Sequence, residues 1–238
     1  MNVRAALVVS AIFLASCASV PPQEPIELTD TAIDAKSGRV GVAMTPLPKI
    51  DTQFPGAGCL LCMATASAVN SALTAHTQKL PYEDLPQLKS AVADLLRKKG
   101  TEAVVIPDEI KIDGLADFAT PGPNVARKDF SPLKEKYRVD KLVMIQINSI
   151  GIWRNYSAYI ATSDPKAVLN GVGYMVNLNT NTYEWYLPVS ITKSADGAWD
   201  EPPNFPGLTN AYFQALEIGK DRFLEPFSKT STAAAGTR

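Results

Sequence analysis

The sequence predicts an α+β fold: one domain in which a mixed sheet, ending in an antiparallel meander, is flanked by helices. Three observations lead to this fold class. A β-rich segment, a helix and a second β-rich segment follow one another between residues 39 and 106; residues 141–150 are apolar on both faces; and strand-like segments joined by short turns fill the last third. The chain has 238 residues, 46% of them apolar, and we expect a single packed domain over 39–228.

The first unit is predicted to be strand, helix, strand. RVGVAMTPLP (39–48) is β-rich as far as Thr45 and is closed by two prolines. A helix is expected over 85–99, because Pro86 comes early, a Lys-rich turn and Gly100 come late, and apolar residues recur at steps of three and four. TEAVVI (101–106) then changes to β-branched residues. The connection after the first strand carries a long insertion, residues 52–80.

The second half alternates helix and strand and then becomes a meander. FSPLKEKYR (130–138) is predicted to be a helix that begins after Ser131, and KLVMIQINSI (141–150) a central strand. YSAYIAT, GVGYMVNLN and YEWYLPVSI are strand-like, and NTNT (179–182) predicts a tight turn. Alternation places Tyr183 and Trp185 on one face. The terminal helix, 208–227, carries an apolar stripe of Leu208, Tyr212, Ala215, Leu216 and Phe223.

Residues 1–16 have the pattern of a signal peptide, with Arg4 and an apolar stretch of about 11 residues. That stretch is shorter than the ~20 residues of a membrane-spanning helix, which is the alternative interpretation. The segment Leu14-Ala15-Ser16-Cys17 resembles the lipobox of bacterial lipoproteins. The resemblance implies that Cys17 becomes the N-terminus and carries acyl chains, palmitate among them. Ala18 replaces the Asp of the inner-membrane retention signal, which implies the periplasm-facing leaflet of a Gram-negative outer membrane.

Two segments are predicted to lie outside the folded domain. Residues 17–38 are rich in Pro, Ser, Thr and acidic residues, so they are expected to be a flexible, lipid-anchored tether, and 229–238 a disordered tail. The formal net charge is −1. A charge this small predicts neither a nucleic-acid partner nor binding to an anionic membrane surface.

A family resemblance rests on three motifs: a helix followed by Gly-x-EAVVIP, the segment KEKYRVDKLVMIQINSIG, and the hairpin VNLNTNTYEW (176–185). Together they resemble periplasmic lipoproteins of the curli-secretion-channel-like group, which share a compact fold with lipoprotein activators of cell-wall synthases. The family hairpin reads V-D-L-x-T-G-x-x-x-W, so Asn177 and Asn181 replace its Asp and Gly. The resemblance covers about 39–225 and implies a scaffold or accessory factor in envelope assembly or export, without an active site. Its implied partners are envelope proteins: a curli-channel-like lipoprotein or a second copy of this chain.

GAGCLLCMATASAV (56–69) contains two cysteines three residues apart. In an oxidising periplasm, Cys59 and Cys62 are expected to form a disulfide that fixes the start of a helix. The alternative is a thiol-disulfide oxidoreductase that uses the same pair, since a helix N-terminus lowers a thiol pKa. A zinc site would add His76 and Glu83 or Asp84, but a second histidine is missing. No cofactor or metal is therefore predicted.

The insertion has no formal charge from Thr52 to Gln78 and is dense in small residues. Small residues let helices approach closely, so the insertion is a candidate for contact with a partner or a bilayer; the alternative is a buried helix of this domain. The candidate contact residues are Leu60, Met63, Ser67 and Leu73. No nucleophile elbow, dinucleotide loop or paired carboxylates of catalytic spacing occur, so we expect a binding protein and not an enzyme.

Overall fold

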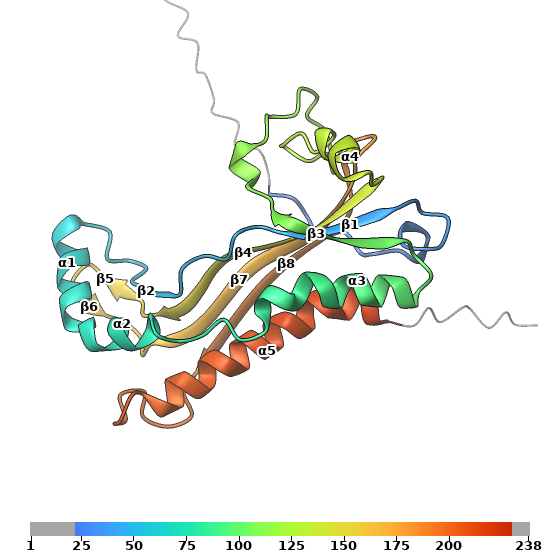
Figure 1. Ribbon diagram of the computed structural model, residues 1–238. Coiled ribbons are helices and arrows are strands. Elements are labelled where there is room, and N and C mark those ends of the chain that lie inside the picture. Colours follow the sequence, from blue (N-terminus) through green and yellow to red (C-terminus); the bar gives the residue numbers. More distant parts are fainter. Residues whose placement is uncertain (1–21, 230–238) are drawn as a thin grey trace, which may run out of the picture.

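The computed structural model describes residues 22–229, which form a twisted six-stranded sheet covered by helices (Figure 1). The predicted α+β class, with an antiparallel meander at the C-terminal side of the sheet, is confirmed. The predicted signal peptide (1–16), Cys17 and residues 230–238 of the predicted tail lie outside the described residues. Within 22–229, no helix is both long and apolar enough to cross a membrane.

The sheet has the strand order β3-β1-β4-β7-β8, and β2 pairs with the far end of β4. Strands β3, β1 and β2 run parallel to their neighbours, whereas β4, β7 and β8 form the antiparallel meander. Side chains of β4 alternate between two buried clusters, Val143 and Ile145 on one face and Leu142 and Met144 on the other, as expected of a central strand. The strands are β1 Val40–Met44, β2 Asp51–Gln53, β3 Ala103–Glu109, β4 Lys141–Trp153, β7 Lys166–Asn177 and β8 Thr182–Ser194.

Two helices lie side by side on one face of the sheet (Figure 1). They are α3 (Leu88–Lys98), which follows a short 3-10 turn (Leu85–Gln87), and α5 (Pro206–Ser228). The predicted helix over 85–99 is confirmed, since its apolar stripe is buried against β1 and β3. The stripe predicted for the terminal helix is buried as well, at Leu208, Tyr212, Ala215, Leu216 and Phe223.

The opposite face is covered by α4 (Pro132–Tyr137) and by the irregular segment around the 3-10 turn Ile112–Gly114. Beneath them Tyr174 packs edge-on against Phe130 and Tyr183. A β-bulge between β7 and β8 makes Tyr183 pair with Val176 and Trp185 with Met175, leaving Glu184 as the extra residue. The predicted sharing of one face by Tyr183 and Trp185 is therefore wrong: Tyr183 joins the aromatic cluster, and Trp185 packs on Phe227 beneath the other face.

Part of the predicted tether belongs to the domain. Ile26 exchanges two backbone hydrogen bonds with Tyr186, of 2.9 and 3.0 Å, on the outer edge of β8. After the 3-10 turn Asp30–Ala32, the Ile33 side chain is 2% exposed, and Lys141 donates a 3.0 Å hydrogen bond to the carbonyl of Ala32. The prediction that all of residues 17–38 form a flexible tether is thus wrong for residues 26–33, because they pair with an edge strand and enter the core.

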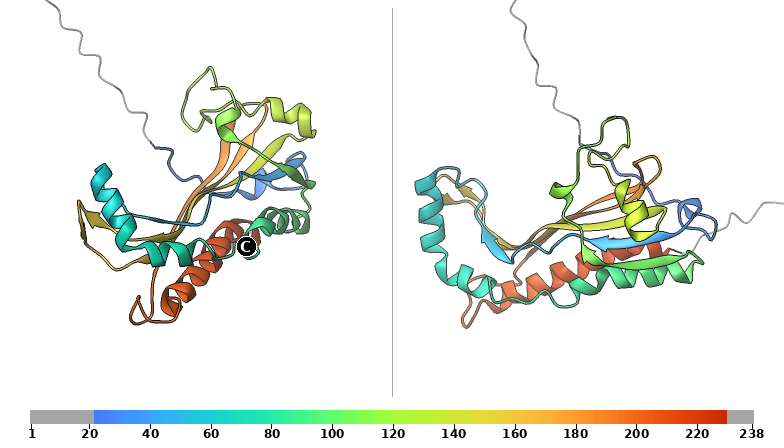
Figure 2. Two further views of the ribbon diagram at one scale, coloured as in Figure 1. Left: turned by 60° about the vertical axis from the view of Figure 1, so that its left-hand side comes forward. Right: turned by 45° about the horizontal axis from the view of Figure 1, so that its top comes forward.

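The insertion and a small hairpin together form a projection at one end of the molecule, which we call the arm: residues 51–80 and 154–164 (Figures 1 and 2). It contains α1 (Leu60–Val69), α2 (Ser71–Thr77), β5 (Tyr156–Ser157) and β6 (Ile160–Ala161). Strands β5 and β6 pair only with each other. The prediction that YSAYIAT is a strand of the meander is therefore wrong, because this segment forms the second half of the arm.

Candidate functional site: the arm and its groove

The arm is attached to the sheet through β2, which pairs in parallel with the end of β4. Gly151 lies opposite Asp51 with φ +140°, and a Cβ at this position would lie 2.0 Å from the Asp51 carbonyl oxygen. Only glycine permits so close an approach. A parallel pairing of three residues thus fixes where the insertion leaves the sheet.

A disulfide joins Cys59 and Cys62, as predicted, with Cα atoms 4.9 Å apart. Cys59 is the N-cap of α1, and its Sγ accepts a 2.9 Å hydrogen bond from the Cys62 N–H. Gly56, with φ +89°, turns the chain into this cap directly against the carbonyl of Tyr156. The bridge therefore sets the start of the helix, while Cys59 remains exposed and Cys62 is buried.

The interior of the arm is small. Phe54, Ala57, Cys62, Ala66 and Tyr156 form a cluster separate from the two main ones, in which the rings of Phe54 and Tyr156 meet edge-on at 5.7 Å. Residues of low volume on α1 allow the hairpin to approach the helix closely. The arm is therefore held by one aromatic pair and its surrounding polar contacts.

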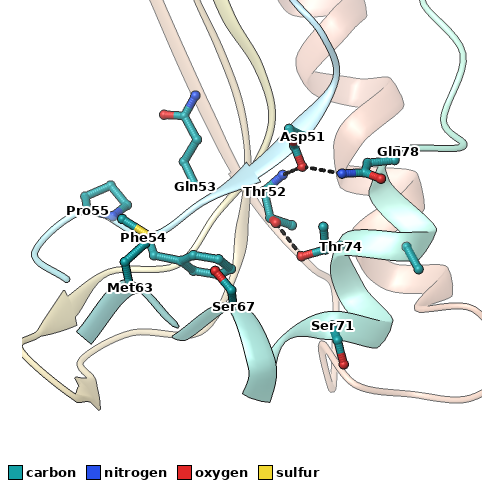
Figure 3. A pocket seen from close by; sticks show the side chains of 11 residues that line it. Asp51, Thr52, Gln53, Phe54, Pro55, Met63, Ser67, Ser71, Thr74 and Gln78 are labelled. Atoms are coloured by element: carbon teal, nitrogen blue, oxygen red, sulfur yellow. Dashed lines mark hydrogen bonds between the residues drawn. The ribbon is translucent and has the colours of Figure 1, made fainter. Parts of the chain in front are cut away.

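A groove of about 740 Å³ lies between β2 and the two arm helices (Figure 3). This volume is within the usual range of ligand sites, about 300–1,000 Å³. Thr52 Oγ1 lies 2.5 Å from Thr74 Oγ1, so a hydroxyl pair joins β2 to α2. The other lining groups are uncharged hydroxyls, amides and apolar side chains: Gln53, Phe54, Pro55, Met63, Ser67, Ser71, Ala75 and Gln78.

Asp51 is the only charged side chain that lines the groove. Burial favours its neutral form, but hydrogen bonds from Gln78 and the Thr52 N–H, together with the charge of Lys49, outweigh burial and place the pKa of Asp51 below its usual value. The carboxylate is therefore ionised at neutral pH and turned toward its own partners. Its structural role is to connect β2 to the end of α2.

Three of the four predicted contact residues lie on the surface of α1. Leu60, Met63 and Ser67 are exposed, and Met63 and Ser67 line the groove. Leu73 is only 2% exposed and belongs to the main core cluster, so its prediction as a contact residue is wrong. The reason is position: α2 lies at the base of the arm, where its inner side faces the body of the domain.

The candidate zinc ligands are not brought together. Cys59 and Cys62 are bonded to each other, the ring Nε2 of His76 lies 2.8 Å from Thr209 Oγ1, and Asp84 pairs with Lys220. Burial, reinforced by Lys79, lowers the pKa of His76, so its ring is neutral at pH 7. Across residues 22–229, no group of three His, Cys, Asp or Glu residues has the arrangement of a metal site.

Sequence reasoning missed the residues that hold the arm together, Asn70, Arg154 and Tyr156. Asn70 is 3% exposed, and its amide makes hydrogen bonds to both other side chains. Arg154 also stacks over the ring of Trp199 at 4.7 Å, which connects the arm to the loop before α5. The sequence does contain a signal that the two segments of the arm belong together: the hairpin, residues 155–163, lacks formal charge just as residues 52–78 do.

No protein-family model and no curated protein sequence matches the chain. Solved structures matched by the fold include the PelC dodecamer from Paraburkholderia phytofirmans, at 10% identity, covering 87% of this chain and 97% of that one, with a TM-score of 0.36. Protein XCC0632 from Xanthomonas campestris matches at 10% identity over 83% and 88%, with a TM-score of 0.36. Lipoprotein GNA1162 from Neisseria meningitidis matches at 12% over 76% and 95%, with a TM-score of 0.27. TM-scores this low assign neither a family nor a function to the chain.

Proposed function

We propose that this protein is a lipid-anchored, non-catalytic scaffold or accessory factor of the outer membrane that binds an envelope protein through the groove of the arm. The observation that carries the proposal is the lining of the groove. It offers neutral hydroxyls, amides and apolar side chains, and its one carboxylate already has three partners of its own. Such a lining is suited to hold an uncharged polypeptide segment, whose side chains need hydrogen bonds and apolar contact but no counter-charge.

The anchor at Cys17 would hold this domain close to the membrane. Ile26 is paired to β8, so the chain from Cys17 to Ile26 can span at most roughly 30 Å, the length of a fully extended chain. The tether is thus much shorter than the 22 residues of 17–38 suggest. A partner bound in the groove would be held near the periplasmic surface of the outer membrane, where assembly and export complexes work.

The partner is a curli-channel-like lipoprotein or a second copy of this chain, as the motif resemblance implies. The test is photocrosslinking in intact envelopes from positions 63 and 67, which line the groove, with position 94 on the exposed face of α3 as control. One dominant protein adduct from 63 and 67, absent from 94, supports the proposal and identifies the partner. Only intramolecular products would exclude it.

One observation favours the alternative of a thiol-disulfide oxidoreductase: Cys59 is exposed at the start of α1 while Cys62 is buried. This arrangement presents one sulfur to an incoming thiolate and keeps the other as the resolving group. The groove does not require that chemistry, so we place it second. The glutathione equilibrium described in the Discussion separates the two functions.

A further inference from the structure

We infer that the tip of the arm seats in the surface of a lipid bilayer, as a second membrane contact beside the acyl anchor. The tip consists of Leu60, Leu61, Tyr159 and Ile160, which are 91%, 65%, 50% and 71% exposed. Of the seven large apolar side chains exposed in residues 22–229, all but Ile218 are on the arm. An exposed apolar patch confined to one projection marks a contact surface. The inference rests on the proposed membrane anchoring and deepens it.

Helix α1 has no polar face. Its inner side is formed by Cys62 and Ala66, and the exposed positions span an arc of roughly 240° at 100° per residue. A helix that keeps one side in water normally carries charged or polar residues there. Ser67 is the one polar side chain exposed on that arc, where Thr65 is half-buried and the other positions are Leu60, Leu61, Met63, Ala64, Ala68 and Val69.

The hairpin brings its apolar residues to the same place. The Tyr159 hydroxyl lies 3.7 Å from Cys59 Sγ, so the β5–β6 turn lies beside the first residues of α1. Figures 1 and 2 show both at the far end of the arm, away from the sheet. A half-exposed tyrosine beside apolar side chains is suited to the boundary between lipid and water.

The absence of charge favours lipid over protein as the occupant. Residues 52–78 and 155–163 contain no Asp, Glu, Lys or Arg, although 20% of the chain is charged. A protein interface keeps a polar rim in which charges are tolerated. A charged side chain at membrane depth is costly, and both segments of the arm avoid it although they are far apart in the sequence.

The dimensions allow partial insertion only. The ten residues of α1 are about 15 Å long, half of the ~30 Å hydrocarbon core of a bilayer. The tip would therefore lie in one leaflet, at the level of the headgroups and the first methylenes. Because residues 52–78 and 155–163 carry no formal charge, this contact needs no anionic lipid and is insensitive to salt.

The position of the tip also orients the domain. From Tyr186, where the N-terminal segment pairs, to Ser194 at the arm end of β8 the strand spans roughly 26 Å. The N-terminal segment thus joins the sheet away from the end that carries the arm. With both the acyl anchor and the tip in one bilayer, two contacts and not one would set the orientation of the domain.

The test uses the full-length lipidated protein in vesicles of zwitterionic phospholipid that contain a phospholipid with a photoreactive acyl chain. Trypsin releases the arm as two peptides, 50–79 and 155–166, because the first lacks internal Lys and Arg and the second begins after Arg154. Lipid adducts are expected on both peptides and on the N-terminal lipopeptide. The matched control peptide is 194–220, which carries the exposed Ile218 away from the arm and is expected to stay unlabelled.

A variant with Leu60→Ser, Leu61→Ser and Ile160→Ser should lose adducts on both arm peptides by about fivefold or more, whereas Ile218→Ser should not change them. All four side chains are exposed, so folding is retained, and circular dichroism checks this. Adducts on the lipopeptide without adducts on the arm peptides would overturn the inference, although they would still support acyl anchoring at Cys17. Arm adducts that stay at the native level in this triple variant would overturn it too. The groove proposal is tested independently by the crosslinks from positions 63 and 67.

Discussion

The side-chain amide of Asn70 donates a 2.6 Å hydrogen bond to the hydroxyl oxygen of Tyr156, which joins two segments that are 86 residues apart. The same amide donates to the carbonyl of Ala66, and its oxygen accepts a 3.0 Å hydrogen bond from Arg154. Asn70 stands at the corner between α1 and α2. All of its polar atoms are thus satisfied in a buried position, and the arm's shape depends on them.

Replacing Asn70→Ala is expected to loosen the arm without unfolding the sheet. The change leaves Arg154 and Tyr156 without their buried partner, at a cost of about 1–3 kcal/mol. Backbone amides of α1 should therefore exchange with solvent roughly tenfold to a hundredfold faster, while exchange in β4 and α5 is unchanged. Hydrogen-exchange mass spectrometry measures both. Asn148→Ala, at an exposed position in β4, is the control, and unchanged exchange in α1 of the Asn70 variant would contradict this role.

Two nearby glycines, Gly56 and Gly58, allow a matched pair of alanine substitutions that tests the packing at the start of the arm. Gly56 has φ +89°, and an added Cβ would lie 1.9 Å from the carbonyl oxygen of Tyr156, whereas nothing lies within 4 Å of a Cβ at Gly58. We expect Gly56→Ala to lower the free energy of unfolding or of local arm opening by about 2 kcal/mol or more, and Gly58→Ala to change it by less than about 0.5 kcal/mol. Urea unfolding and the rate of elastase cleavage between 56 and 78 are the measurements. Equal behaviour of the two variants would show that the hairpin is not packed against Gly56.

The sequence predicted the body of the fold well, because its elements are long and periodic. Leu88, Val92 and Leu96 recur at helical spacing and are buried in α3, and the apolar run of β4 lies at the centre of the sheet. Errors occurred where one contact outweighs periodicity. A single antiparallel bridge adds Ile26 to β8, and one extra residue at Glu184 moves Tyr183 and Trp185 to different faces.

The candidate site was predicted only in part for the same reason. The disulfide and the exposure of Leu60, Met63 and Ser67 follow from local sequence, but the burial of Leu73 depends on how α2 meets the domain. The contacts of Asn70 with residues 84 and 86 positions away have no spacing that a single sequence reveals. Buried polar residues of this kind have the composition of a loop and become recognisable only once two segments meet.

The Cys59–Cys62 bridge is expected to have a local, structural effect. Closing so short a loop stabilises the folded chain by about 2 kcal/mol in the chain-entropy description. The variant with Cys59→Ser and Cys62→Ser should therefore lose about that much stability and keep the crosslinks from positions 63 and 67. In glutathione buffers, alkylation and mass spectrometry should find the native bridge oxidised throughout. A pair that equilibrates with glutathione, or a variant that loses a thiol-exchange activity, would favour the oxidoreductase instead.

Alkaline pH should destabilise the domain through its buried tyrosines. Burial, reinforced by Tyr186, raises the pKa of Tyr183 from 10.0 to about 12, and burial raises the pKa of Tyr174 and Tyr212 further still. The folded chain therefore keeps protons that the unfolded chain releases above pH 10.0. Below that pH these tyrosines do not change the free energy of unfolding, and they lower it as the pH rises from 10.0 toward their raised pKa values.

Tyr183→Phe should make this fall shallower between pH 10.0 and about 12, because it removes one of the three groups with a raised pKa. Within residues 22–229 the Tyr183 hydroxyl makes no hydrogen bond, so the substitution costs none. Urea midpoints across that interval measure the slope, and tyrosinate absorbance follows ionisation of the eight tyrosines. Three of them should ionise only together with unfolding. Ionisation of all eight while the circular dichroism of the sheet is intact would mean that the Tyr174–Tyr183–Tyr186 cluster is open to water, and the packing of the segment around α4 over this face would then be incorrect.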